Sequence, residues 1–103
     1  MANWRLVNPE GVVSGETFRF GRRPNSLEGK TVLLRWNGKH NGDIFLAKVG
    51  ELLTEKVKGI KVVKNWEVAP GTSETSSSPE LSQKFAATLA ALKPDLAIAS
   101  TGD

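Results

Sequence analysis

The fold of this chain is decided by residues 30–41, which read KTVLLRWNGKHN. The first seven of these residues form a short, continuous apolar run with β-branched members, a pattern typical of a strand that is covered on both faces. A polar Asn-Gly pair follows at once and predicts a sharp turn. We therefore expect a buried strand that leads directly into a turn.

A helix is expected next, from about residue 42 to residue 57. Asn41 is predicted to be its N-cap, and Asp43 lies in the first turn, where a negative charge suits the helix dipole. Basic residues near its end and Gly59 after it are typical of a helix C-terminus. One buried stripe is predicted from the i, i+4, i+7, i+8 spacing of Phe45, Val49, Leu52 and Leu53.

The rest of the chain repeats the alternation. Residues 60–64 predict a second strand, residues 70–77 a flexible loop, and residues 96–99 a final strand after Lys93-Pro94. Ser78 and Pro79 are expected at the N-cap and first position of a second helix. Its predicted buried face is Leu81, Phe85, Leu89 and Leu92. The small residues expected to allow a close approach to the sheet are Ala86, Ala87, Ala90 and Ala91.

The order strand, helix, strand, helix, strand predicts an α/β fold with a parallel sheet and right-handed crossovers. We expect strand order 2-1-3, the core of a Rossmann-like or flavodoxin-like half-domain over residues 30–103, preceded by an arm over residues 1–29. Its aromatic residues Trp4, Phe18 and Phe20 suggest that the arm packs on something. The third strand is left with an unpaired edge, so a homo-oligomer is expected, through this strand or through the arm. In the alternative, the arm folds over its own sheet and keeps the chain monomeric.

Composition excludes several classes of protein. The 103 residues are 39% hydrophobic and 24% charged, which is ordinary for a soluble domain. No apolar run approaches the length of a membrane span and no secretory signal is present, so a cytoplasmic location is expected. The absence of cysteine excludes disulfides, thiolate metal sites and a cysteine nucleophile within these residues, and one histidine cannot build a metal cage. No cofactor or metal is therefore expected.

The net charge of +3 is mild, and its most concentrated part is the arginine-rich stretch over residues 19–23. We interpret this stretch as a solvated or anion-pairing loop. Nucleic-acid binding, which usually shows a basic stripe with interleaved aromatic residues, is the less favoured interpretation.

The turn between the first strand and the first helix is the main candidate site. In doubly wound proteins this turn binds anions, because free backbone N–H groups and the helix dipole point at the ligand. Gly38 permits a tight turn, Lys39 supplies a positive charge, and Asn37 and Asn41 offer side-chain amides. The alternative is a polar turn with a capping asparagine. His40 is better explained as an exposed loop histidine than as a general base.

Other residues are expected at the same edge of the sheet. Lys64 and Trp66, at the end of the second strand, are candidate pocket walls. The chain reaches this edge again at its last residues, Thr101, Gly102 and Asp103, directly after the final strand. Ligands and catalytic groups of open parallel sheets gather beyond the carboxyl ends of the strands.

Residues 29–34, GKTVLL, followed by Asn37-Gly38-Lys39 and Asn41, resemble the N-terminal signature of the UGSC-motif (seleno)protein family. That family pairs this opening with a strand that ends in Gly-Asp immediately before a selenocysteine- or cysteine-Gly-Ser-Cys element. Gly102 and Asp103 match the two residues upstream of that element. The resemblance covers roughly residues 29–103 and a Pro9-bearing arm. The family is similar in its motif to the selenoprotein subunit of glycine, sarcosine and betaine reductases.

The resemblance implies the N-terminal portion of a thiol- or selenol-dependent redox protein. Its redox pair is expected directly after Asp103, so this chain by itself is expected to be inactive and to be a truncated domain, through a UGA codon read as a stop or through deliberate removal. A small anionic substrate would be bound by Asn37, Gly38, Lys39 and Asn41. The redox pair would be positioned by Thr101, Gly102 and Asp103, with His40 in support. The alternative is a complete small α/β module that binds an anionic ligand or a protein partner.

Overall fold

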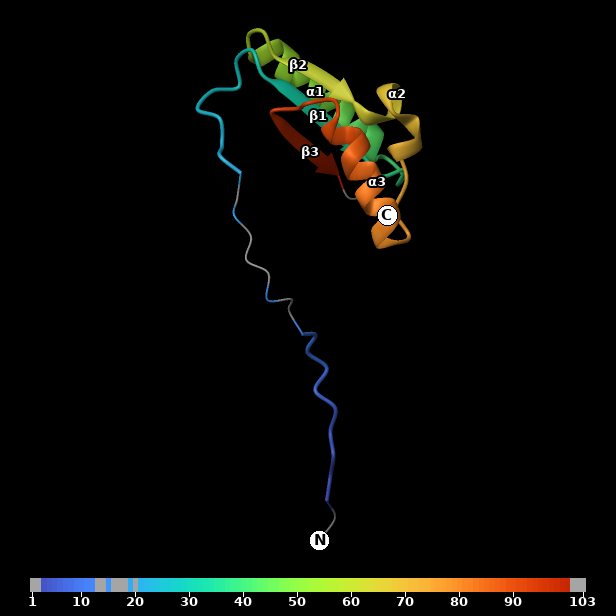
Figure 1. The fold of residues 1–103 in the computed structure, drawn as a ribbon. Helices are drawn as coiled ribbons and strands as arrows, with labels where there is room; N and C mark the ends of the chain where they lie inside the picture. The colour runs from blue at the N-terminus through green and yellow to red at the C-terminus, as the bar shows by residue number, and fades with distance from the viewer. Residues whose placement is uncertain (1–2, 13–14, 16–18, 20, 101–103) are drawn as a thin grey trace.

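A computed structural model of the chain describes residues 3–12, 15, 19 and 21–100. Three parallel strands form one sheet, and helices lie on both of its faces (Figure 1). The elements, in chain order, are β1 (Thr31–Trp36), α1 (Gly42–Lys56), β2 (Lys61–Lys64), α2 (Asn65–Val68), η1 (Pro70–Thr72), α3 (Pro79–Ala90) and β3 (Leu96–Ser100).

The sheet has strand order β2-β1-β3, with both pairs parallel, which confirms the predicted α/β fold and its topology. β1 is the central strand, and its Val32, Leu33 and Leu34 are buried. Two bonds join the start of β1 to the residue before β3: the Asp95 N–H donates to the Thr31 carbonyl at 2.8 Å, and the Thr31 N–H donates to Asp95 Oδ2 at 2.8 Å. The continuous apolar run therefore marks the one strand that has neighbours on both edges and cover on both faces.

α1 covers one face of the sheet, but it does so through a different stripe from the predicted one. Its buried residues are Gly42, Leu46 and Gly50, whereas Phe45 is 60% exposed and Leu52 is 38% exposed. The prediction that Phe45 and Leu52 belong to the buried face is therefore wrong.

The reason for this rotation is a close approach at two glycines. A Cβ atom on Gly50 would lie 2.9 Å from Leu34 Cδ1 and 3.1 Å from Val62 Cγ1. A Cβ atom on Gly42 would lie 2.7 Å from Trp36 Cδ1. The helix axis can approach the sheet this closely only with glycine at these two positions. Leu46, between them, fills the core, and Phe45 and Leu52 lie beside the contact.

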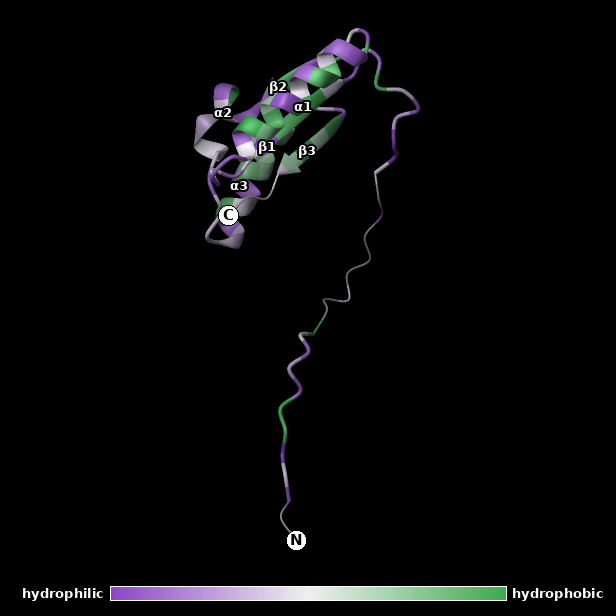
Figure 2. Ribbon diagram, turned by 180° about the vertical axis from the view of Figure 1, so that it is seen from behind, coloured by the Kyte–Doolittle hydropathy of each residue, from purple (hydrophilic) through white to green (hydrophobic). Residues whose placement is uncertain are grey.

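α3 lies on the opposite face, as the two views in Figures 1 and 2 show. Its N-terminus is capped as predicted, because the Ser78 hydroxyl accepts a hydrogen bond from the Leu81 N–H at 3.1 Å. Phe85 and Leu89 are buried as predicted. The prediction that the alanines of this helix allow a close approach to the sheet is wrong. The buried residues of α3 are Phe85 and Leu89, and the alanines beside them face outward. The exposed residues are Ala86, Ala87, Ala90 and Ala91.

The segment between β2 and α3 is more ordered than predicted. The loop expected over residues 70–77 begins with the 3₁₀ turn η1, and the short helix α2 precedes it. Both contain a buried polar residue, Asn65 in α2 and Thr72 in η1. This segment therefore belongs to the packed domain and contributes to the edge of the sheet described below.

The described part of the N-terminal arm stands away from the sheet (Figure 1). The apolar side chains of residues 3–12 are almost fully exposed, with Trp4 at 84% and Val12 at 100%, whereas Leu27 at the end of the arm packs against the core. The expectation that the arm packs is thus wrong for Trp4, while Phe18 and Phe20 lie outside the described residues. Within the described ranges, none of the helices has the length and apolar character needed to cross a membrane.

Candidate functional site

The turn that follows β1 is held by hydrogen bonds within itself. The Lys39 N–H donates to Asn37 Oδ1 at 3.2 Å, and the Gly42 N–H donates to the Lys39 carbonyl at 3.3 Å. Gly38 and Asn41 both have positive φ angles, of 85° and 69°. Such a sequence of left-handed and ordinary conformations can turn successive N–H groups toward one concave side, which is how backbone anion sites form.

Trp36, the last residue of β1, fixes this turn from the sheet side. Its indole Nε1–H donates to the Lys39 carbonyl at 2.6 Å. Its ring meets the Trp66 ring edge-on, with 6.1 Å between the centroids. The aromatic pair lies against the hydrophobic core of the domain, so the turn is attached to a rigid support.

Asn65 is the central polar residue of this edge. It is fully buried, and its Oδ1 accepts from the Trp36 N–H at 2.7 Å while its Nδ2 donates to the Trp36 carbonyl at 3.0 Å. The β1–β2 pairing ends at Leu34 and Lys64, so the Asn65 side chain supplies the partner that β2 no longer offers to Trp36. Nδ2 also donates to Thr72 Oγ1 at 3.1 Å.

Sequence reasoning did not identify Asn65. The only available signal was a polar residue directly after a β-branched strand, which is common at strand ends. Its full burial follows from the fold of α2 and η1, where the Thr72 hydroxyl donates in turn to the Ala69 carbonyl at 2.7 Å. A fully satisfied buried network of this kind makes the end of β1 rigid.

The turn also contacts the segment after η1. A Cβ atom on Gly38 would lie 2.6 Å from the Ser73 carbonyl oxygen, so only glycine fits here. The Thr75 hydroxyl donates to the Asn37 carbonyl at 3.5 Å. Residues 37–41 are therefore packed against a second loop on one side, which the sequence alone did not indicate.

The start of α1 lies over the carboxyl ends of both β1 and β3. A Cβ atom on Gly42 would lie 2.8 Å from Ser100 Oγ, and the Ser100 hydroxyl donates to the Gly42 carbonyl at 3.4 Å. In the order β2-β1-β3 the chain runs from β1 to β2 on one side and then crosses back to β3 on the other side, so β1 and β3 form the switch point at which open α/β sheets bind ligands. Thr101, Gly102 and Asp103 lie outside the described residues.

Asn41 occupies the N-cap position of α1, but its side chain accepts no capping hydrogen bond. The prediction that it caps the helix with its side chain is therefore wrong. The physical reason is the left-handed backbone of Asn41, because a capping side chain requires an extended N-cap residue. The N-terminal amides of α1 are consequently not covered by this side chain.

The remaining predicted residues occupy different surroundings. His40 is exposed on the turn. Lys64 Nζ lies 3.8 Å from Glu67 Oε1 and 6.0 Å from the centre of the Trp66 ring. Trp66 contacts the Trp36 ring edge-on and packs on the hydrophobic core, so it stabilises the position of Trp36 beside the turn. In the described part of the chain, no three acidic or histidine side chains gather in a way that could hold a metal ion.

The fold and this edge define the class of the protein: a small doubly wound α/β domain with a glycine-containing turn at its switch point. The sequence model of the UGSC family matches residues 5–103. The chain therefore belongs to the UGSC family, which confirms the resemblance seen in the sequence. Comparison with curated proteins and with solved structures found no match.

Proposed function

We propose that this chain forms the anion-binding portion of a thiol- or selenol-dependent redox protein similar to the glycine, sarcosine and betaine reductases. The observation that carries the proposal is the uncapped start of α1 at the switch point of the sheet. There, Gly38 and Asn41 both adopt left-handed backbone conformations, and the Asn41 side chain leaves the helix amides uncovered. The first N–H groups of any helix have no partner within the helix. In α1 the Gly42 N–H donates to the Lys39 carbonyl, and the start of the helix lies over the carboxyl ends of β1 and β3.

In this proposal the residues of the turn divide the work. Gly38 lets the backbone pass close to Ser73, Asn37 holds the Lys39 N–H, and the Lys39 ammonium adds positive charge. Asn37 and Asn41 keep amide N–H donors for the ligand. A carboxylate or phosphate is the chemical group that such donors favour.

The redox part of the proposal rests on family membership. These 103 residues contain no cysteine, so this chain binds and orients the substrate and does not itself exchange electrons. A selenocysteine or cysteine directly after Asp103 would supply the nucleophile, with a second cysteine to resolve it. Mass spectrometry of the protein from its native source tests this, because the proposal requires a continuation with the Gly-Ser-Cys element. A native chain that ends at Asp103 with an ordinary stop codon would contradict it.

Titration with phosphate, acetate and glycine betaine tests the anion site. Trp36 Nε1 bonds to the turn, so its fluorescence should respond, and a Trp4→Phe background removes the signal from the exposed arm. Lys39→Ala should weaken binding about tenfold, which corresponds to one charged contact in a partly exposed site. Lys61→Ala, an exposed lysine at the other end of the sheet, is the matched control. Equal affinities in the two variants would contradict the proposal.

The second candidate function is a small α/β binding module for an anionic ligand or a protein partner, without redox chemistry. It is favoured by the same turn and by the absence of cysteine from this sequence. The two functions share the titration result and differ in the mass of the native protein. An intact anion site in a native protein without the redox element would support the module.

A further inference from the structure

A small basic pocket lies at the amino end of the sheet, opposite the end that carries the candidate anion site. Its volume is about 320 Å³, and it is lined by Arg22, Arg23, Pro24, Asn25, Lys30 and Asp95. Lys30 directly precedes β1 and Asp95 directly precedes β3, and the arm reaches the sheet at this end (Figure 1). The fold therefore brings part of the arginine-rich stretch, which the proposed function does not use, to the start of two strands.

The residues beside the pocket attach it to the folded domain. Leu27 packs against the hydrophobic core, and the Gly29 N–H donates to the Lys58 carbonyl at 3.3 Å. On the other side, Asp95 Oδ2 accepts a hydrogen bond from the Thr31 N–H at 2.8 Å. The lysine and the carboxylate of the pocket are thus held by the sheet, and the two arginines lie just before an anchored turn.

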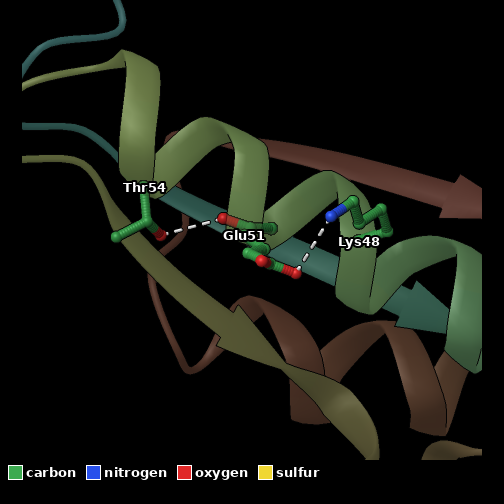
Figure 3. Close-up of polar contacts among 4 residues, drawn as sticks. Lys48, Glu51 and Thr54 are labelled. Atoms are coloured by element: carbon green, nitrogen blue, oxygen red, sulfur yellow. Dashed lines mark hydrogen bonds and ion pairs between the residues drawn. The ribbon is translucent and has the colours of Figure 1, made fainter.

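The lysines of a second, larger depression have carboxylate partners. An open groove of about 1060 Å³ lies between β2 and α1, and both charged and apolar residues line it. Figure 3 shows one of its ion pairs, with Lys48 Nζ 3.5 Å from Glu51 Oε2. Lys64 Nζ, in the same groove, lies 3.8 Å from Glu67 Oε1. Positive charge in this groove is therefore neutralised by the chain itself.

The positive charge of the basic pocket is not neutralised in this way. Within the part of the chain that the structure describes, Arg22, Arg23 and Lys30 form no ion pair. Asp95 is the acidic residue of the pocket, and one of its oxygens already accepts the Thr31 N–H. Three positive charges and one negative charge leave about +2 in the pocket. A phosphate monoester carries a charge of about −1.5 to −2 at pH 7, which matches it.

We propose that this pocket binds the terminal phosphate group of a small phosphate monoester. Each guanidinium offers a planar fork of N–H donors that fits two phosphate oxygens, and the Lys30 ammonium adds a point charge. The Asn25 side chain supplies a further amide donor.

The size and composition of the pocket favour a small molecule over nucleic acid. Its volume is at the lower limit of small-molecule sites, which is about 300 Å³. A phosphodiester carries only one negative charge, and no aromatic residue lines the pocket to stack on a base. The site lies at the opposite end of the sheet from residues 37–41, so it does not depend on the proposed function.

The experiment follows the backbone amide signals of the isotope-labelled 103-residue protein by NMR during titration with inorganic phosphate and with glycerol phosphate. Ionic strength is kept constant, since salt screens exposed charges. A short DNA duplex without terminal phosphates, titrated in the same way, represents the nucleic-acid backbone. We expect both phosphate compounds to shift the signals of Asn25 and Lys30 with a dissociation constant of roughly 1 mM or below.

Two variants change the pocket in opposite directions. Arg22→Gln/Arg23→Gln should weaken phosphate binding about tenfold or more. Asp95→Asn keeps an oxygen for the Thr31 N–H but removes the negative charge, so it should tighten binding about threefold.

The matched control is Arg5→Gln/Lys84→Gln, which removes two positive charges at exposed positions outside the pocket. It should leave the affinity within about twofold of the wild type. Well-dispersed amide signals show for each variant that the domain remains folded.

Saturable shifts at Asn25 and Lys30 that the arginine variant weakens and the control does not would support the proposal. Equal weakening in these two variants, or looser binding in Asp95→Asn, would overturn it. A duplex that shifts these signals while the phosphate compounds do not would identify nucleic acid as the ligand and also overturn it. Shifts confined to residues 37–41 would report the candidate anion site alone, so the pocket would be refuted while the proposed function stands.

Discussion

The carboxyl ends of the two outer strands, β2 and β3, make different kinds of contact with the end of β1. Beyond β2, the chain turns into α2, and Asn65 joins the end of β2 to Trp36 and Thr72 with three hydrogen bonds of 2.7–3.1 Å. β3 pairs with β1 as far as Trp36 and Ser100, and the Ser100 side chain adds one longer bond, from its hydroxyl to the Gly42 carbonyl at 3.4 Å. The comparison teaches that the end of β1 is supported by strand pairing on the β3 side and by the side-chain hydrogen bonds of Asn65 on the β2 side.

The same asymmetry holds along the edges. β2 begins and ends with a lysine, and both charged and apolar residues line the groove beside it, whereas β3 carries no charged side chain. The predictions that follow test the strength of each side.

The largest effect is expected at the β2 side. Asn65→Ala leaves the N–H and carbonyl of Trp36 without a partner at a partly buried position and should lower the free energy of unfolding by about 2–3 kcal/mol. Urea denaturation measures it, with Asn25→Ala, at an exposed position, as the control. A loss below about 0.5 kcal/mol would show that water or a shifted backbone replaces the amide. It would contradict the conclusion that the hydrogen bonds of Asn65 support the end of β1.

The second effect concerns the packing of the start of α1 against the ends of β1 and β3. Gly42→Ala places a methyl group against Trp36 Cδ1 at 2.7 Å and Ser100 Oγ at 2.8 Å, so the start of the helix must move away. We expect a loss of about 1–2 kcal/mol in unfolding free energy and weaker anion binding. Gly71→Ala, where a Cβ atom meets nothing within 4 Å, is the matched control. Equal stability of the two variants would contradict the close packing of Gly42 against Trp36 and Ser100.

A third prediction has opposite signs for stability and for binding. Asp43 lies in the first turn of α1, where its carboxylate favours the helix and opposes an anion at the same place. Asp43→Asn should lower the free energy of unfolding by about 0.5 kcal/mol and tighten phosphate or carboxylate binding about twofold to threefold. Denaturation and titration of the same preparations measure both. Binding that weakens in this variant would place the anion away from the start of α1.

The smallest effect is expected at the β3 side. Ser100→Ala removes the single long hydrogen bond to Gly42 and should change the free energy of unfolding by less than about 0.5 kcal/mol. Ser78→Ala, which removes the N-cap of α3, is the comparison and should cost about 1 kcal/mol. A Ser100→Ala loss as large as that of Asn65→Ala would remove the difference between the two sides.

Part of the site could be predicted from the sequence. The apolar run of β1 and the Asn-Gly pair after it located the turn, because both signals are local. The hydrogen bond from Lys39 N–H to Asn37 Oδ1 is of the same local kind. The support that Asn65 gives to the end of β1 was not predictable in this way. Asn65 lies far from Trp36 along the chain and finds its partner only when β2 pairs with β1.

The sequence by itself determined the order of the three strands and the two long helices, the parallel sheet with order β2-β1-β3 and the capped start of α3. These features follow from periodicity and from residue types whose backbone preferences are local. Only the tertiary structure decided which flank of α1 is buried. The apolar spacing predicted Phe45 and Leu52, but Gly42 and Gly50 let the helix backbone approach Trp36, Leu34 and Val62 more closely than any bulkier residue permits. Close packing therefore outweighed the pattern of hydrophobic residues, and it left Phe45 and Leu52 exposed.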